Sequence, residues 1–124
     1  MSEKMTTERI ALGKQGEEIA LKYLKKKAYK IIERNYRSRL GEIDIIASHK
    51  GATVFIEVKT RGNTDFGLPQ ESVDERKQQH MARVALNYIR HKGLPDGNFR
   101  FDVVGIDFFS GRPEITLIKD AFQL

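Results

Sequence analysis

The residues of this sequence best suited to do chemistry are two acids and a lysine: Asp44, Glu57 and Lys59. Carboxylates placed opposite each other on paired strands repel, so Asp44 and Glu57 would need a partner that offsets the repulsion. A hard divalent cation does this, because Mg²⁺ takes one or two carboxylates together with water and phosphate oxygens. Lys59 can orient an attacking water and neutralise the charge that develops on a phosphate. Metal, water nucleophile and ammonium group are the components of phosphodiester hydrolysis.

A predicted hairpin brings these three residues together. Residues 41–48 and 53–59 are rich in β-branched side chains, and Lys50-Gly51 between them predicts a turn. With the turn centred there, Asp44 lies directly opposite Glu57. Side chains alternate along a strand, so one face of the hairpin carries the acids. The other face is wholly apolar and is predicted to be core: Ile43, Ile45, Ala47, Val54, Ile56 and Val58.

The same hairpin also allows an interpretation without chemistry. In this register Glu42 lies opposite Lys59, so the two can form a surface ion pair while Asp44 and Glu57 are solvated separately. Mixed charged strand faces are common. The two strands alone therefore leave both interpretations open.

A fourth acid, Glu17, comes from a helix predicted over residues 7–27. At the helical repeat Glu17 falls inside the apolar sector of this helix, whereas Glu18 lies among lysines. A carboxylate facing the core is costly unless it is paired or coordinates a metal, which favours Glu17 as a metal ligand. The alternatives are a partly exposed edge position or a buried partner for an arginine. Gly13 and Gly16 would let this helix approach the sheet closely.

A second helix is predicted C-terminal to the hairpin, after a loop over residues 60–71. Ser72, followed by Glu75 three positions later, matches a capping box with Ser72 as the N-cap. The helix should end near Lys92, because Gly93 follows. Its predicted core stripe consists of Ala82, Ala85, Leu86 and Ile89.

Three more strands are predicted over residues 29–36, 99–109 and 114–119, which gives the order α-β-β-β-α-β-β. One mixed β-sheet flanked by two helices satisfies this order, because the helices are needed to cover its apolar faces. A chain of 124 residues has room for one sizeable core, so residues 1–124 are predicted to form a single α/β domain.

Several classes of protein are disfavoured by composition. The sequence has no apolar run long enough to span a membrane, and Met1–Lys4 lacks the apolar core of a signal peptide. The absence of cysteine excludes disulfides, thiolate metal sites and a cysteine nucleophile. We therefore expect a cytoplasmic protein without a membrane partner.

The positive charge of the chain is clustered. Lysine and arginine number 22 against 17 acids, for a net charge of +5. From Lys22 to Arg39 cations outnumber acids eight to one, and from Arg76 to Lys92 there are five cations and no acid. Such clusters favour binding to a nucleic-acid backbone, because each neutralised phosphate releases counterions. The alternative is that these lysines and arginines keep a small domain soluble.

The motifs of this chain also resemble those of a known family. Asp44 followed by Glu57-Val58-Lys59 is similar to the PD-(D/E)xK pattern of restriction-endonuclease-like nucleases. The wider pattern resembles the YraN-like family of predicted endonucleases over nearly the whole chain. It comprises Gly16-Glu17-Glu18-Ile19-Ala20, Arg34-Asn35-Tyr36-Arg37, Gly41-Glu42-Ile43-Asp44-Ile45-Ile46, Phe55-Ile56-Glu57-Val58-Lys59, Glu71-Ser72-Val73 and Arg100-Phe101-Asp102-Val103-Val104.

This resemblance implies the restriction-endonuclease-like fold of archaeal-type Holliday-junction resolvases, in which a helical glutamate joins the strand acids at the metal. Carried over to this chain, it implies Glu17, Asp44 and Glu57 as ligands of Mg²⁺ or Mn²⁺. It also implies Asp44, Glu57 and Lys59 as the catalytic residues. Ile43 stands where the pattern names proline, which is not a ligand.

The function expected from the residues and the resemblance is that of a Mg²⁺-dependent endodeoxyribonuclease, structure-selective or non-specific. The alternative is a non-catalytic nucleic-acid-binding module on the same fold, acting with a partner. Cleavage of a four-way junction needs two coordinated incisions and therefore a homodimer, but the sequence reveals no dimer surface.

The roles of three other polar residues remain open at this stage. Gln70 and Glu71 precede the second helix, where they could approach a metal or a phosphate or remain solvated. Asp102 could support the metal ligands from behind or be a satisfied polar residue near the edge of a strand. The glycine-containing loop over 60–71 could be a substrate-entry flap or an ordinary loop.

Overall fold

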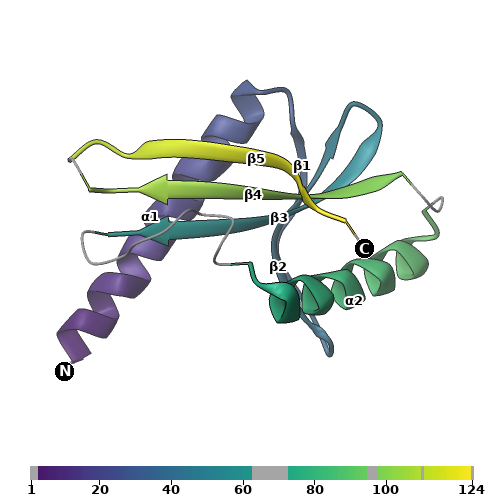
Figure 1. Cartoon of the computed structure of the whole chain (residues 1–124), viewed down its shortest axis with the longest axis horizontal. Helices are drawn as coiled ribbons and strands as arrows, with labels where there is room; N and C mark the ends of the chain where they lie inside the picture. Colours follow the sequence, from purple (N-terminus) through teal and green to yellow (C-terminus); the bar gives the residue numbers. More distant parts are fainter. Residues whose placement is uncertain (1–2, 63–72, 95–97, 110, 124) are drawn as a thin grey trace.

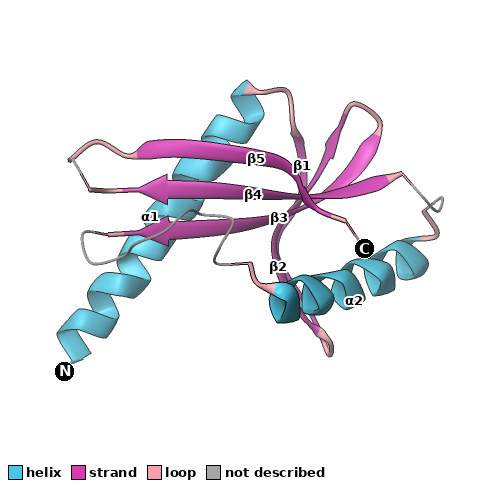
Figure 2. Ribbon diagram, viewed as in Figure 1, coloured by secondary structure: helices cyan, strands magenta, loops and turns pink. Residues whose placement is uncertain are grey.

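A five-stranded mixed sheet with one helix on each side makes up the molecule (Figures 1 and 2). The computed structural model describes residues 3–62, 73–94, 98–109 and 111–123, and side chains from Thr7 onward. The elements are α1 (Glu3–Lys26), β1 (Lys30–Ser38), β2 (Gly41–His49), β3 (Ala52–Arg61), α2 (Glu75–Lys92), β4 (Phe99–Asp107) and β5 (Glu114–Phe122). This confirms the predicted order and fold class. No helix in the described ranges is long and apolar enough to cross a membrane.

The strands lie in the order β1-β2-β3-β4-β5, which is also their order along the chain. All neighbours are antiparallel except β3 and β4, which are parallel. A parallel pair needs a crossover connection, and the segment that contains α2 supplies it. The sheet is mixed because α2 lies between β3 and β4 in the sequence.

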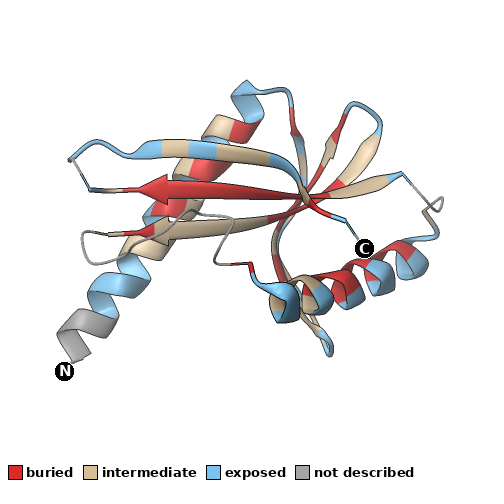
Figure 3. Ribbon diagram, in the orientation of Figure 1, coloured by how far each residue is buried: buried red, intermediate tan, exposed pale blue. Residues whose placement is uncertain are grey.

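Each helix covers one face of the sheet, so the central strands are buried on both sides (Figures 1 and 3). Against α1 pack Ile45, Ala47, Val54, Ile56, Val104 and Ile106. β4 is buried over most of its length because it lies inside the sheet under both layers. Burial on both faces explains why β4 is almost continuously apolar rather than alternating.

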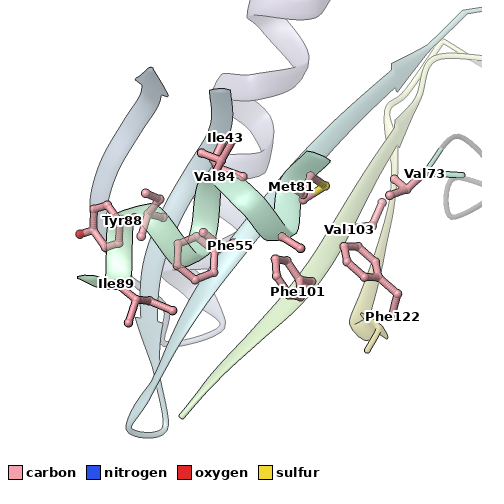
Figure 4. Close-up of a cluster of buried hydrophobic side chains, with 13 residues drawn as sticks. Ile43, Phe55, Val73, Met81, Val84, Tyr88, Ile89, Phe101, Val103 and Phe122 are labelled. Atoms are coloured by element: carbon pink, nitrogen blue, oxygen red, sulfur yellow. The ribbon is translucent and has the colours of Figure 1, made fainter. Parts of the chain in front are cut away.

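The layer between α2 and the sheet is built around aromatic rings (Figure 4). Phe101 lies against Phe55 and Phe122, with ring centroids 5.8 and 4.6 Å away. Tyr88 from α2 meets Phe55 edge-on at 5.8 Å. Rings of this size contribute much of the buried apolar area, so this cluster fixes α2 on the sheet.

Of the three predictions about α2, the N-cap was wrong, the core stripe was right for three of its four residues, and the C-terminus was right. The N-cap is Asp74, whose side chain accepts the Lys77 N–H at 2.9 Å, and not Ser72, which lies outside the described residues. Ala82, Ala85 and Ile89 are buried as predicted, but Leu86 is 37% exposed. Met81, Val84 and Tyr88 complete the buried face. The C-terminus is as predicted, because Gly93 takes a left-handed conformation that favours glycine.

The predicted apolar face of the hairpin was also partly wrong. Ile45 and Ala47 face α1 as a regular strand requires, but Ile43 packs in the cluster under α2. Ile46 and Phe55, which the alternation assigns to the acid-bearing face, are fully buried there as well. Both faces of the hairpin are thus core, and β2 departs from simple alternation around Asp44.

Gly16 sets the distance between α1 and β3. A Cβ atom on Gly16 would overlap the side chain of Thr60, whereas a Cβ on Gly13 would meet nothing within 4 Å. The predicted close approach of the helix therefore applies to Gly16 and not to Gly13. Because Thr60 directly follows Lys59, this contact holds α1 close to the end of β3.

We expect Gly16→Ala to lower the free energy of unfolding by about 1–3 kcal/mol, because the added methyl group forces the helix away from Thr60. Gly13→Ala is the matched control. Alanine is the better helix former, so that variant should be unchanged or about 0.5–1 kcal/mol more stable. Urea unfolding of both variants measures the difference, and equal midpoints would contradict the close packing of α1 at Gly16.

Candidate active site

Strands β2 and β3 separate at the end of the sheet where the predicted acids lie. Their pairing runs from His49–Ala52 to Ile45–Ile56, in the register predicted from the turn. Beyond that point β2 remains paired with β1 and curves toward α2 (Figure 1). Asp44 lies on this departing segment, and its Oδ2 accepts the backbone N–H of Val58 at 2.8 Å. A carboxylate thus takes a donor of β3 that continued strand pairing would have used.

The separated strands border a cavity of about 440 Å³ that contains the predicted site. Glu17, Asp44, Glu57 and Lys59 all line it, so the structure brings the four residues together from α1, β2 and β3. Ile10, Gly13, Lys14, Glu42, Val58, Thr60 and Lys77 complete the lining. The site is therefore built where two strands separate and both helices come close.

Asp44 carries the most perturbed carboxyl group of this cavity. Burial raises its pKa from the ordinary 3.8 to about 8, and the negative charge of Glu57 is the second cause. The Val58 N–H lowers this pKa, whereas a hydrogen bond with Glu57 and the charge of Glu17 raise it. Asp44 thus keeps its proton near neutral pH in the metal-free protein, beside the Glu57 carboxylate.

Glu17 faces the cavity with one oxygen left unsatisfied. Its side chain is 18% exposed, and Oε1 is buried without a hydrogen-bond partner. The Arg34 guanidinium lies 3.9 Å from that oxygen, too far for a hydrogen bond, and instead bonds Glu18. The alternative of a buried arginine partner therefore holds only in part, since an arginine is near but does not satisfy the carboxylate. A buried oxygen without a donor is what a cation would correct.

Two lysines approach the acids from different elements. Lys59 lies on the same strand face as Glu57 and has no ion-pair partner among the described residues. Lys77 reaches over from the first turn of α2, and its Nζ lies 3.0 Å from Glu57 Oε2. Partial burial lowers the pKa of Lys77, but Glu57 and then Asp44 and Glu42 raise it, and the net shift is upward. In the sequence Lys77 belongs only to the basic cluster of residues 76–92, because nothing there shows that α2 crosses to β3.

The structure does not contain the surface ion pair between Glu42 and Lys59 that the alternative interpretation predicted. Glu42 pairs with Arg37 of the neighbouring strand at 3.5 Å, with both side chains well exposed. The predicted position of Glu42 opposite Lys59 is wrong, because β2 has already left β3 at that point. Asp44 and Glu57 are hydrogen-bonded to each other and not separately solvated.

The acid pair fits a hard divalent cation. As the side chains stand, no three His, Asp or Glu groups converge on a common metal position within the part of the chain that the structure describes. A magnesium site does not need three, because Mg²⁺ is held by one or two carboxylates and completes its shell with water and phosphate oxygens. The raised pKa of Asp44 shows that a second negative charge beside Glu57 is unfavourable without an added cation. Glu17 faces the same cavity with its free oxygen.

The cations of α2 border a second cavity, of about 410 Å³, beside the site. Four basic side chains line it together with one acid: Arg76, Lys77, His80, Arg83 and Asp74. The other predicted basic cluster is divided, since Arg34 and Arg37 are engaged in ion pairs with acids. Lys25, Lys26 and Lys27 lie exposed at the far end of α1. Of the two clusters, the one on α2 adjoins the acids.

Asp102 is a satisfied buried residue of β4, paired in register with Ile56 of β3. It accepts the Tyr29 hydroxyl at 2.6 Å, the Arg100 guanidinium at 3.0 Å and the Asp120 N–H at 3.0 Å. Arg100 also contacts His49, whose ring stacks on Tyr29 at 4.0 Å. The polar-residue alternative is therefore the one observed. Gln70 and Glu71, and with them most of the predicted flap, lie outside the described residues.

Comparison with known proteins gives one family. A model described as "Uncharacterised protein family UPF0102" matches residues 16–106, a span that contains Glu17, Asp44, Glu57, Lys59 and Lys77. A protein of that name from Geotalea uraniireducens is 50% identical over 115 residues, 92% of this chain and 91% of the relative. One from Syntrophus aciditrophicus is 45% identical over 118 residues, 95% of this chain and 93% of the relative. These matches confirm the predicted YraN-like family, and their names give no activity.

We expect Mg²⁺ or Mn²⁺ to raise the Tm, and the rise to grow between about pH 6 and about pH 8.5. Over this range folded Asp44 keeps a proton that the unfolded chain has lost. Without metal, its contribution to the free energy of unfolding therefore falls as the pH rises toward the folded pKa near 8. A bound cation replaces this proton, so it binds better at higher pH. Thermal melts with and without metal across this range measure the effect.

Asp44→Asn tests whether Asp44 holds the ion that raises the Tm. Asparagine is uncharged and keeps an oxygen for the Val58 N–H, so the metal-free variant should be as stable as the parent or slightly more stable. It should lose most of the metal-dependent rise in Tm. A variant with the full metal response would show that Asp44 does not hold the ion.

Proposed function

The chain belongs to the UPF0102 family, and from its carboxylate cavity we propose that it is a metal-dependent nuclease that hydrolyses DNA phosphodiester bonds. The observation that carries the proposal is the convergence of Asp44, Glu57, Glu17 and Lys59 where two strands separate. The spacing of these residues also resembles the PD-(D/E)xK superfamily of restriction-endonuclease-like enzymes. The reaction class follows from the site and not from the names of relatives.

Asp44 and Glu57 would hold Mg²⁺ or Mn²⁺, with Glu17 facing the same ion. When bound, the ion supplies Lewis-acid polarisation of a phosphate and lowers the pKa of a coordinated water. Asp44 would release its proton to accommodate the ion. The Val58 N–H continues to orient the Asp44 carboxylate. These residues fix the position of charge before the substrate arrives.

Lys59 would act on the reacting groups directly. It projects from β3 beside Glu57, and no carboxylate of the described chain neutralises it. Its ammonium group can orient the attacking water and stabilise the negative charge that develops on the phosphate oxygens. Close packing at Gly16 and Thr60 keeps the end of β3 in place, so that Lys59 is positioned by the fold.

The substrate class follows from the surroundings of the acids. The basic cavity on α2 adjoins the site through Lys77, which lines both. A phosphate backbone bound across Arg76, His80 and Arg83 would place a neighbouring phosphodiester over the acids. We propose that cleavage is selected by DNA structure or by no feature rather than by sequence. We place the enzyme in the cytoplasm.

Lys59→Ala should abolish metal-dependent cleavage, with a loss of about 10²-fold or more. Affinity for DNA in Ca²⁺ should change little, because one cation among many contributes modestly. Lys14→Ala is the matched control, since Lys14 lines the same cavity from α1 and should retain activity. Cleavage of single-stranded, duplex, flap and four-way-junction DNA in Mg²⁺, Mn²⁺ or EDTA provides the measurement.

If the Lys59→Ala variant cuts as well as the parent, the proposed chemistry is wrong. A parent that binds DNA but cuts none of these substrates would instead be the nucleic-acid-binding module considered above. Cleavage of the junction alone by paired incisions would require a homodimer.

Glu17→Gln should behave differently from Lys59→Ala. The amide cannot supply the negative charge that faces the metal, so the apparent metal affinity should fall and higher Mn²⁺ should partly restore cleavage. Glu18→Gln is the control, because its side chain is exposed and pairs with Arg34 outside the cavity. Metal titrations of cleavage rate separate the two variants, and an unchanged titration for Glu17→Gln would remove Glu17 from the site.

A further inference from the structure

A lysine contacts one of the two strand acids that would hold a cation. Lys77 Nζ lies 3.0 Å from Glu57 Oε2, and Glu57 is only 16% exposed. The lysine comes from α2, on the opposite side of the cavity from α1, and its own side chain is 42% exposed. It therefore neutralises Glu57 without being buried with it. A divalent ion at the same carboxylate must compete with this ammonium group.

Lys77 can move without entering an apolar environment. It lines the acid cavity, the basic cavity of about 410 Å³ with Arg76, His80 and Arg83, and a third cavity of about 420 Å³. The third cavity is bordered by Arg37, Ser38, Gly41, Glu42 and His80. Lys77 is the residue common to all three linings, so rotation of its flexible side chain transfers the ammonium group from one cavity to another.

The surroundings decide when that transfer is favourable. In the empty protein the acid cavity attracts Lys77, and the cations of the α2 cavity repel it. A divalent ion on Asp44 and Glu57 would repel the Lys77 ammonium group from the acid cavity. A phosphate among Arg76, His80 and Arg83 would attract the ammonium group into the α2 cavity. Both changes drive the ammonium group in the same direction.

We propose that Lys77 is an internal, exchangeable cation that neutralises Glu57 in the metal-free protein and moves to a substrate phosphate when a divalent ion binds. This inference rests on the proposed nuclease function and assigns to it a positioning residue from α2. Metal and nucleic acid then bind with positive coupling, because each favours the displaced position of Lys77. By linkage, DNA raises metal affinity by the same factor by which metal raises DNA affinity.

The test is Mn²⁺ binding by Lys77→Met, measured by calorimetry without DNA. Removing the competing ammonium should tighten Mn²⁺ binding by about threefold or more, the order expected from charge at this separation near a protein surface. Arg76→Met is the matched control, since it removes a neighbouring α2 cation that lines only the basic cavity. That variant should bind Mn²⁺ within about twofold of the parent.

A second measurement tests the displaced position. In Ca²⁺, Lys77→Met and Arg76→Met should each flatten the dependence of log DNA affinity on log salt by about 0.9, the loss of one phosphate contact. In EDTA only Arg76→Met should do so, because Lys77 is then held by Glu57. Lys77→Gln repeats both measurements with a polar side chain, should the Met variant fail to fold.

The outcomes separate the two hypotheses. A parent that does not bind Mn²⁺ would overturn the proposed metal site itself. A parent that binds Mn²⁺, with Lys77 variants that bind it equally or more weakly, would overturn only the exchange of cations. In that case Lys77 would be a fixed structural partner of Glu57.

Discussion

The separation of β2 from β3 is the constraint on which the candidate site depends. Paired strands satisfy each other's backbone groups, so two carboxylates at this position of a closed sheet would face both repulsion and occupied donors. Once β2 leaves β3 after Ile45–Ile56, Asp44 can take the Val58 N–H and still approach Glu57. The opening also admits Glu17 from one helix and Lys77 from the other. Without the opening, these four side chains would not share a cavity.

Apolar packing on both faces of the sheet stabilises the separated strands. Both faces of the hairpin are buried along its paired part, with Ile45 under α1 and Phe55 under α2. Those two layers hold the strands on either side of the opening, although the ladder between them has ended. Gly16 against Thr60 fixes one side, and the aromatic cluster under α2 fixes the other. The charged groups are thus placed by apolar packing and not by their own attraction.

Sequence patterns predicted the element order, the hairpin register and the grouping of Glu17 with the strand residues, because turn chemistry and periodicity are local. They failed where a third element decides the outcome. Ile43 packs under α2 because β2 bends, and alternation along a strand cannot reveal a bend. Leu86 is exposed because it lies at the margin of the stripe of α2 that faces the sheet, while Ala82, Ala85 and Ile89 are buried. Lys77 was missed as a partner of Glu57 for the same reason, since the contact depends on how α2 crosses the sheet.

The parallel pairing of β3 with β4 has a consequence for the order of assembly. This pairing joins Thr53 to Phe99 and so encloses the whole α2 segment. The chain must lose the entropy of closing this long loop before the contacts between the two strands can stabilise it. The β1–β2–β3 meander closes only short loops and carries both strand acids. We therefore expect the acid pair to form in the early, local half of the fold, while Lys77 arrives with the later one. In a newly made chain, divalent ions could then reach Asp44 and Glu57 before Lys77 competes with them.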